Sequence, residues 1–163
     1  MKAQKLRICV ITPGYNEAQV IQQVVKDSLN HFKHSPYDIT LLVVNDGSKD
    51  NTSLEAYKGG AVVIDHLMNT GAGGATLTGL RYAMKHGYDI AATMDADGQH
   101  APEDVLKGID ILAKGQADLL IGSRLIDNKG MSRVKVIGNK GLSFITYLLF
   151  GVNSTDSQSG LRV

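Results

Sequence analysis

The sequence predicts an α/β fold in which a mostly parallel sheet is covered by helices on both faces. Short apolar runs rich in β-branched residues, typical of buried strands, recur at residues 7–12, 39–45, 61–66, 89–94 and 118–123. Segments with helical spacing of apolar residues lie between several of these runs. A chain that alternates strands and helices favours parallel pairing, because each helix connects two strands that run in the same direction.

The helical segments have recognisable ends. Residues 17–32 place their apolar side chains near one stripe, and residues 76–86 end before Gly87, which suits the left-handed position after a helix. A further helix begins at Pro102, with Glu103 and Asp104 in its first turn, where a fixed φ and negative charge are favourable. The chain has 163 residues, of which 43% are hydrophobic, and this predicts one compact domain over residues 1–163.

Composition excludes several classes of protein. The 17 basic and 16 acidic residues give a net charge of +1 without long blocks of one sign, so no nucleic-acid partner is predicted. Cys9 is the one cysteine of the sequence, and its apolar neighbours fit strand packing in a reducing compartment. No apolar run approaches the roughly 20 residues that span a bilayer, and none forms a signal-peptide core. We therefore expect a cytoplasmic location.

Two carboxylates follow the fourth predicted strand, at the edge of the sheet where ligands bind in such folds. Asp95, Asp97 and Gln99 would share one side of the chain if the backbone stayed extended. Hard carboxylate oxygens at this spacing, completed by phosphate oxygens and water, suit Mg²⁺ or Mn²⁺. The alternative is an acidic turn in which Asp97 and Gly98 reverse the chain.

Three further segments follow predicted strands. Residues 13–17 offer an aromatic ring, an amide and an acid, or form a turn that starts a helix. Asp46 can accept hydrogen bonds from a base or ribose, whereas Ser48 or Asp50 can cap the next helix. Residues 69–75 precede the predicted helix, and their glycines allow close backbone approach while free amides face an anion. Because this segment follows the third strand and not the first, a dehydrogenase is disfavoured.

The order and spacing of four segments resemble those of family 2 glycosyltransferases with the GT-A fold, in particular dolichol-phosphate mannose synthases and polyprenyl-phosphate glucosyltransferases. The segments are residues 13–17, 44–52, 69–79 and 95–100. The resemblance implies that the following residues bind the nucleotide: Pro13, Tyr15, Asn16, Glu17, Asp46, Gly71, Gly73, Asp95 and Ala96. It implies that Asp95, Asp97 and Gln99 hold Mg²⁺ or Mn²⁺.

The resemblance continues toward the end of the chain. Arg124 and Arg133 match family arginines that face phosphate, a group that guanidinium binds with two parallel hydrogen bonds. Asp156 lies in a segment that resembles the acceptor side of the family's site. The implied catalytic residues are therefore Asp97, Arg124, Arg133 and Asp156. Residues 142–150 could present an apolar face to a lipid or membrane surface, although a buried core helix is the alternative.

The sequence also departs from the family pattern. Asn45 stands where family members commonly have aspartate, and Gly14 stands where alanine or threonine is commoner. The first difference could alter contacts to the nucleobase. Family members also continue beyond the position of Val163, so we expect part of the acceptor region to be missing from this chain.

These features together predict metal-dependent transfer of a sugar, with inversion, from a UDP- or GDP-sugar to an acceptor such as a polyprenyl phosphate at the inner face of the membrane. Such an acceptor is already anionic and needs no strong base, whereas a hydroxyl acceptor would need one, for which Asp156 is the candidate. Two alternatives remain open. One is a sugar-phosphate nucleotidyltransferase, although the basic glycine-rich loop expected after its first strand is missing; the other is a nucleotide-sugar-binding domain without catalysis.

Overall fold

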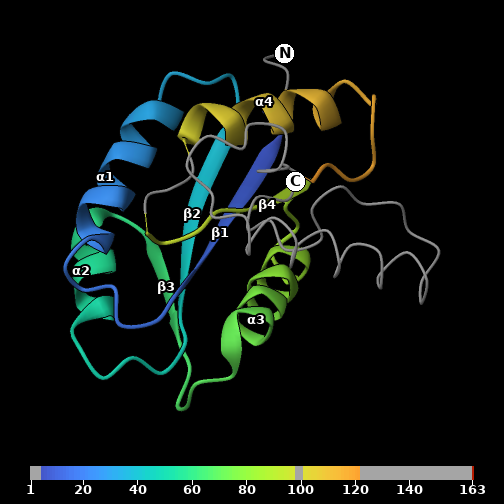
Figure 1. Cartoon of the computed structure of the whole chain (residues 1–163). Helices are drawn as coiled ribbons and strands as arrows, with labels where there is room; N and C mark the ends of the chain where they lie inside the picture. The colour runs from blue at the N-terminus through green and yellow to red at the C-terminus, as the bar shows by residue number, and fades with distance from the viewer. Residues whose placement is uncertain (1–4, 98–100, 122–162) are drawn as a thin grey trace, which may run out of the picture.

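The computed structural model describes residues 5–97, 101–121 and 163, in which strands and helices alternate (Figure 1). The strands are β1 (Arg7–Gly14), β2 (Asp38–Asn45), β3 (Val62–Asp65) and β4 (Ile90–Thr93). The helices are α1 (Ile21–Phe32), α2 (Thr52–Gly59), α3 (Gly71–Lys85) and α4 (Pro102–Ala113). Within these described ranges, no helix is both long enough and apolar enough to cross a membrane.

The strands form one parallel sheet in the order β3-β2-β1-β4. β1 pairs with β2 along its whole length and with β4 from Ile8 to Ile11. The chain moves outward from β1 through β2 to β3 and then crosses back to place β4 on the other side of β1. The strand order therefore reverses between β1 and β4, and a reversal of this kind opens a crevice at the carboxyl ends of the two strands.

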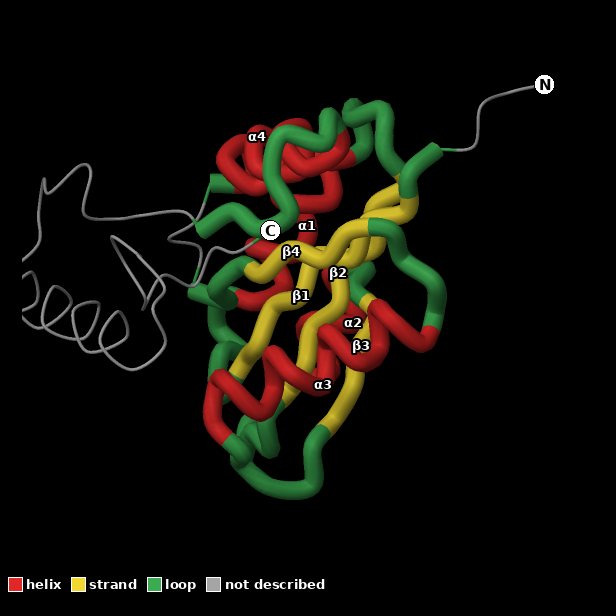
Figure 2. Tube along the Cα trace, turned by 90° about the vertical axis from the view of Figure 1, so that its right-hand side faces the viewer, coloured by secondary structure: helices red, strands yellow, loops and turns green. Residues whose placement is uncertain are grey.

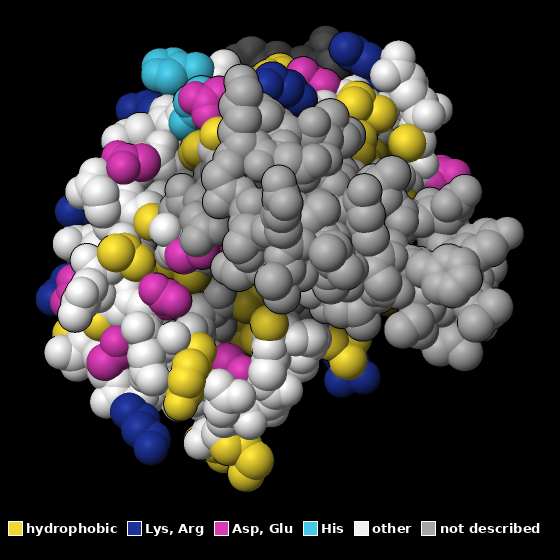
Figure 3. Space-filling model, viewed as in Figure 1, with side chains coloured by type: hydrophobic (Ala, Val, Ile, Leu, Met, Phe, Trp, Pro, Cys, Tyr) yellow, Lys and Arg dark blue, Asp and Glu magenta, His cyan; other side chains and the backbone are white. Residues whose placement is uncertain are grey.

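Helices cover both faces of the sheet, as the sequence predicts. α1, α2 and α4 lie on one face, where α1 contacts both of the others, and α3 packs on the opposite face (Figures 1 and 2). On the side of the molecule seen in Figure 3, basic and acidic side chains of the described residues are interspersed, as expected for a net charge of +1. The predicted fold class is confirmed.

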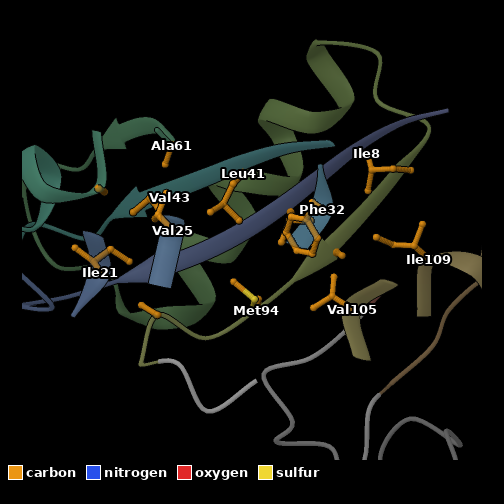
Figure 4. Close-up of a cluster of buried hydrophobic side chains, with 14 of the residues drawn as sticks. Ile8, Ile21, Val25, Phe32, Leu41, Val43, Ala61, Met94, Val105 and Ile109 are labelled. Atoms are coloured by element: carbon orange, nitrogen blue, oxygen red, sulfur yellow. The ribbon is translucent and has the colours of Figure 1, made fainter. Parts of the chain in front are cut away.

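Alternate residues of the central strands supply two apolar cores, one on each face. Ile8 and Leu41 belong to the larger core, which Figure 4 shows together with Phe32 from α1 and Ile109 from α4. Cys9 belongs to the smaller core beneath α3. Burial raises the pKa of its thiol to about 11, so the thiol stays protonated at neutral pH and serves as a packing residue.

The first four predicted strands are confirmed, but several other boundaries differ. Over residues 118–121 the chain forms a β-bridge at Ile121 and not a regular strand, and Leu120 exchanges two backbone hydrogen bonds with Val163. The end of this predicted strand, residues 122–123, lies outside the described ranges. α1 begins at Ile21 and not at residue 17, because the amides of residues 17 and 18 donate to side chains near the start of α2. α2 is the helix that Ser48 or Asp50 was expected to cap, although its bounds were not predicted.

α3 begins five residues earlier than predicted, at Gly71 instead of residue 76. The glycine-rich segment is therefore the first turn of the helix and not a loop before it. The pattern of apolar residues missed this turn because glycine disfavours helix interiors. A carboxylate from another strand end compensates, since Asp46 accepts hydrogen bonds from the amides of Thr70 and Gly71.

Gly79 is the point of closest approach between α3 and the sheet. A Cβ built on Gly79 would lie 2.3 Å from Cγ2 of Ile11, which is a severe overlap within the smaller core. We expect Gly79→Ala to lower the free energy of unfolding by about 1–3 kcal/mol through overpacking. Gly73→Ala is the matched control, because a Cβ there meets no heavy atom within 4 Å and alanine favours the helix. Urea denaturation without nucleotide should separate the two variants, and equal losses would contradict this packing.

Candidate functional site

The segments that follow β1, β2 and β4 meet at the carboxyl edge of the sheet. Gly14 ends β1, and a Cβ built there would lie 3.6 Å from Cγ2 of Thr52 and 3.9 Å from Cβ of Ala96. Residues from three separate parts of the chain therefore surround one strand end. This place is the crevice that the reversal of strand order creates, so it is where a ligand is expected.

The predicted carboxylates lie beside this crevice. Backbone pairing continues beyond β4, since the amide of Met94 donates to the carbonyl of Ile11 at 2.9 Å. Asp95 is half-buried, Ala96 is buried against Gly14, and Asp97 is exposed. The chain turns at residues 96–97, so the backbone is not extended there, and residues 98–99 lie outside the described ranges. A shared side for residues 95, 97 and 99 stays a prediction.

The donor set fits a hard divalent cation. Within the described parts of the chain, no three or more His, Cys, Asp or Glu side chains cluster as a complete metal site. Asp95 and Asp97 could therefore hold a cation only together with oxygens from a bound group and from water. Mg²⁺ is commonly bound in this way, through one or two carboxylates and the phosphates of a substrate. The third predicted ligand, Gln99, lies outside the described residues.

The turn after β1 is held by the loop after β2. Asn16 has a positive φ of 58°, and its amide donates to Oγ of Ser48 at 2.9 Å. Its side-chain oxygen in turn accepts from the amide of Lys49 at 2.9 Å. These bonds fix the turn from Pro13 to Glu17, which leaves the ring of Tyr15 43% exposed beside the crevice. An exposed aromatic ring on a fixed turn is available to stack on a flat ligand.

The capping predictions for the start of α2 have different outcomes. Ser48 does not cap the helix, because its hydroxyl is used by the turn after β1. Asp50 does accept the amide of Thr52, the first residue of α2, at 3.0 Å, and it also accepts the amide of Ala18 at 3.1 Å. The hydrogen bond from the Thr52 hydroxyl is the main reason that the pKa of Asp50 lies below its ordinary value.

Asp46 is the best-connected carboxylate among the described residues. It is 3% exposed and accepts hydrogen bonds from the Thr70 amide at 2.9 Å, the Thr70 hydroxyl at 2.8 Å and the Gly71 amide at 2.7 Å. Nδ1 of His66 lies 2.8 Å from the same carboxylate, while its Nε2 lies 2.9 Å from the Thr78 hydroxyl. Burial opposes ionisation of Asp46, but these hydrogen bonds outweigh it and lower the pKa.

This network joins two strand ends to the start of a helix. Asp46 follows β2, His66 follows β3, and Thr70 and Gly71 begin α3. The carboxylate of Asp46 thereby caps the start of α3, although Asp46 comes from a distant part of the sequence. Direct contact between Asp46 and a base or ribose stays a prediction, since protein donors already approach both carboxylate oxygens.

The two glycines predicted to bind the nucleotide border open space. Gly71 has a φ of 82°, a conformation that favours glycine, and a Cβ built on Gly71 or Gly73 would meet no heavy atom within 4 Å. The packing of the protein therefore does not explain why residue 73 is a glycine. Close approach of a ligand to the first turn of α3 would explain it, and amides at a helix start favour anions.

Sequence reasoning missed part of this site. His66, Thr70 and Thr78 were not singled out, although His66 and Thr70 follow the third predicted strand, and the strand-end rule could have found them. The predicted Arg124, Arg133 and Asp156 lie outside the described residues, as do residues 142–150. Their proposed roles stay predictions.

The contact of Asn45 with Asp65 gives a physical reason for asparagine at a position where family members commonly have aspartate. Its Nδ2 donates to Oδ1 of Asp65 at 2.7 Å, and Asn45 is 7% exposed. We expect Asn45→Asp to cost about 1–3 kcal/mol at pH 7, because two carboxylates would then face each other. The repulsion requires both carboxylates to be ionised, so the loss should be present at neutral pH and shrink as the pH falls toward about 4, where carboxylates gain protons.

A second substitution, Asp65→Asn, should rescue the stability that Asn45→Asp loses. Adding Asp65→Asn restores one donor and one acceptor with their roles exchanged, so urea denaturation of the double variant should recover most of the lost stability. A double variant that is less stable than Asn45→Asp alone would contradict the pairing.

Comparison with known proteins agrees with the geometry. The sequence model of the family described as "Glycosyl transferase family 2" matches residues 9–157. The UDP-N-acetylglucosamine--dolichyl-phosphate N-acetylglucosaminyltransferase of Methanococcus voltae is 44% identical over 98% of this chain and 69% of its own length. The polyprenol monophosphomannose synthase of Mycolicibacterium smegmatis is 32% identical over 96% of this chain and 60% of its own. The chain thus spans roughly two thirds of the length of these relatives.

Solved structures support the fold. The glucosyl-3-phosphoglycerate synthase of Mycobacterium tuberculosis, crystallised with Mn²⁺, UDP-glucose and phosphoglyceric acid, superimposes with a TM-score of 0.63 and 24% sequence identity. The superposition covers 99% of this chain and 57% of the synthase. From the match over residues 9–157, the relatives and the shared architecture, we conclude that the chain belongs to glycosyl transferase family 2 and has the GT-A fold.

Proposed function

We propose that the chain binds a UDP-sugar together with Mg²⁺ or Mn²⁺ and transfers the sugar, with inversion, to a polyprenyl phosphate. The observation that carries the proposal is the position of Asp95 and Asp97 at the β1/β4 reversal, beside the fixed turn that exposes Tyr15. The cation would neutralise charge on the departing diphosphate. UDP-N-acetylglucosamine is the expected donor, because the 44% identical relative is named for it.

The described residues position the donor. Tyr15 offers its ring to the nucleobase, and Asp46 holds the start of α3 so that the open first turn at Gly71 and Gly73 faces the diphosphate. Asp95 and Asp97 supply hard oxygen ligands for the cation. A site that is fixed before the donor binds loses little free energy in ordering itself.

Transfer is a direct displacement. An oxygen of the acceptor phosphate forms a bond to the anomeric carbon while the bond from that carbon to the diphosphate oxygen breaks, and the nucleoside diphosphate leaves with the electron pair. An anionic acceptor needs no strong base. Arg124 and Arg133 are proposed to orient its phosphate. The family assignment disfavours a nucleotidyltransferase.

A thermal-shift panel tests donor binding. The chain is heated with UDP, UDP-N-acetylglucosamine, GDP or GDP-mannose, each with and without Mn²⁺. At a concentration 100 times its dissociation constant, a ligand stabilises the folded state by about 2.7 kcal/mol, which raises the melting temperature of a chain of this size by about 5–10 °C. We expect the largest rise with UDP-N-acetylglucosamine and Mn²⁺, and no rise with any nucleotide would refute the proposal. Binding without sugar transfer to a polyprenyl phosphate would instead favour the non-catalytic alternative.

A further inference from the structure

The outer side of α3 has an unusual composition. The exposed residues of this helix are all apolar, glycine or basic, and the whole helix lacks acidic residues. They are Ala72, Gly73, Leu77, Leu80, Arg81, Met84 and Lys85. Surface helices ordinarily present charged and polar side chains on their outer side. The outer side of α3 therefore differs from an ordinary solvated helix face.

The large apolar residues form a stripe. Leu77, Leu80 and Met84 are separated by three and four residues, so they lie one above another on the helix, and they are 47%, 38% and 81% exposed. Ala75 and Ala83 on the other side are buried in the core beneath α3. The stripe runs over about 10 Å of the helix at 1.5 Å per residue. It points away from the sheet.

Two more exposed apolar residues lead into the helix. Leu67 and Met68, in the loop between β3 and α3, are 104% and 71% exposed. Figure 1 places this loop at the lower tip of the molecule, and Figure 3 shows hydrophobic side chains gathered there. Exposed apolar side chains gathered in this way commonly mark an interaction site.

The charges beside the stripe favour a particular partner. Arg81 and Lys85 follow one another at the i and i+4 positions, along one flank of the stripe. Apolar side chains flanked by basic ones match a membrane surface, where the apolar groups enter the boundary of the acyl chains and the basic groups meet anionic headgroups. We propose that the outer face of α3, made of Leu77, Leu80, Arg81, Met84 and Lys85, docks on an anionic lipid surface.

This docking face is independent of the donor site. Its side chains lie on the helix surface that faces away from the sheet, whereas the donor site uses the first turn of α3 and the strand ends. A polyprenyl phosphate resides in a membrane, so docking would bring the chain to the proposed acceptor. The docking itself, however, requires neither that acceptor nor catalysis, and each can be tested alone.

Sedimentation with lipid vesicles tests the proposal. The full chain is mixed with vesicles of phosphatidylcholine alone or with about 30% phosphatidylglycerol. We expect binding to the anionic vesicles that weakens as salt is raised, since salt screens the basic side chains. The triple variant Leu77→Ser, Leu80→Ser, Met84→Ser and the double variant Arg81→Glu, Lys85→Glu should each bind at least about tenfold more weakly.

A matched control lies on the opposite face of the sheet. Leu54 and Tyr57 of α2 are 50% and 72% exposed, so Leu54→Ser with Tyr57→Ser removes comparable apolar surface and should leave vesicle binding unchanged. Circular dichroism and the UDP-induced thermal shift verify that each variant is folded.

Absence of binding to anionic vesicles, or binding by the α3 variants that equals that of the native chain, overturns the proposal. The proposal is also overturned if the native chain does not bind vesicles but self-associates, and if the α3 variants abolish this self-association. That result would assign the face to a second copy of the chain. Loss of nucleotide binding alone would refute the proposed function and leave the docking intact.

Discussion

Asp97→Ala is expected to abolish the Mn²⁺-dependent part of donor binding while the melting temperature of the free protein barely changes. Asp97 is exposed, and substitutions of exposed side chains usually change the free energy of unfolding by no more than about 0.5 kcal/mol. The metal, however, would lose one of two carboxylate ligands, and sugar transfer would lose stabilisation of the leaving diphosphate. We expect turnover to fall by about 10²–10³-fold, the range typical of losing one group that stabilises developing charge.

Thermal shifts and isotope-based transfer assays with and without Mn²⁺ measure both effects of Asp97→Ala. Asp27→Ala is the control, because Asp27 is also an exposed carboxylate but lies on α1, where it accepts a hydrogen bond from Gln23. The control should keep the full response to Mn²⁺. An unchanged metal response in Asp97→Ala would remove this carboxylate from the site.

Asp46→Ala is expected to cause the largest loss of stability. The substitution removes the acceptor of the Thr70 amide and the shorter of the two acceptors of the Gly71 amide, which keeps Oδ1 of Asn69 at 3.1 Å, and it removes the carboxylate beside the ring of His66. Each donor left without its acceptor costs about 1–3 kcal/mol, so the loss over this network is expected to be about 3–5 kcal/mol. For a chain of this length, such a loss lowers the melting temperature by roughly 10 °C. Hydrogen exchange should show the greatest loss of protection in the first turn of α3.

The pH dependence of stability distinguishes this network from simple packing. Because the folded pKa of Asp46 is lowered, its stabilisation is present above the unfolded pKa of about 3.9 and is lost as the pH falls through the folded pKa. The difference between the native chain and Asp46→Ala should therefore shrink in strong acid. Asp46→Asn, which keeps one acceptor oxygen, should be intermediate. If the free energies of unfolding of the native chain and Asp46→Ala differed equally at every pH, the loss would come from a packing defect and not from the missing charge.

The elements that depend on local pattern could be predicted from the sequence. The four strands of the sheet are short and apolar, with β-branched residues in each, and the start of α4 at Pro102 follows directly from proline and two acids in the first turn. Boundaries set by contacts between distant residues could not be predicted. The start of α3 depends on Asp46, and that of α1 depends on Thr52 and Asp50, which apolar periodicity does not encode.

The candidate site shows the same division. Topology alone places Asp95 and Asp97 beside Pro13–Glu17, because parallel strands bring their carboxyl ends to one edge. The turn at residues 96–97, with Ala96 buried beside Gly14, is a feature that only the folded chain reveals. Likewise, the presence of asparagine at position 45, where family members commonly have aspartate, has a physical reason only because the folded chain places Asp65 beside it.

Anomalous diffraction from crystals grown with UDP-N-acetylglucosamine and Mn²⁺ would locate the cation directly. A manganese peak is expected within about 2.5 Å of a carboxylate oxygen of Asp95 or Asp97, with the diphosphate completing its coordination beside Gly71 and Gly73. A donor bound in the crevice whose diphosphate lies away from both carboxylates, or a manganese ion bound elsewhere, would contradict the proposed site.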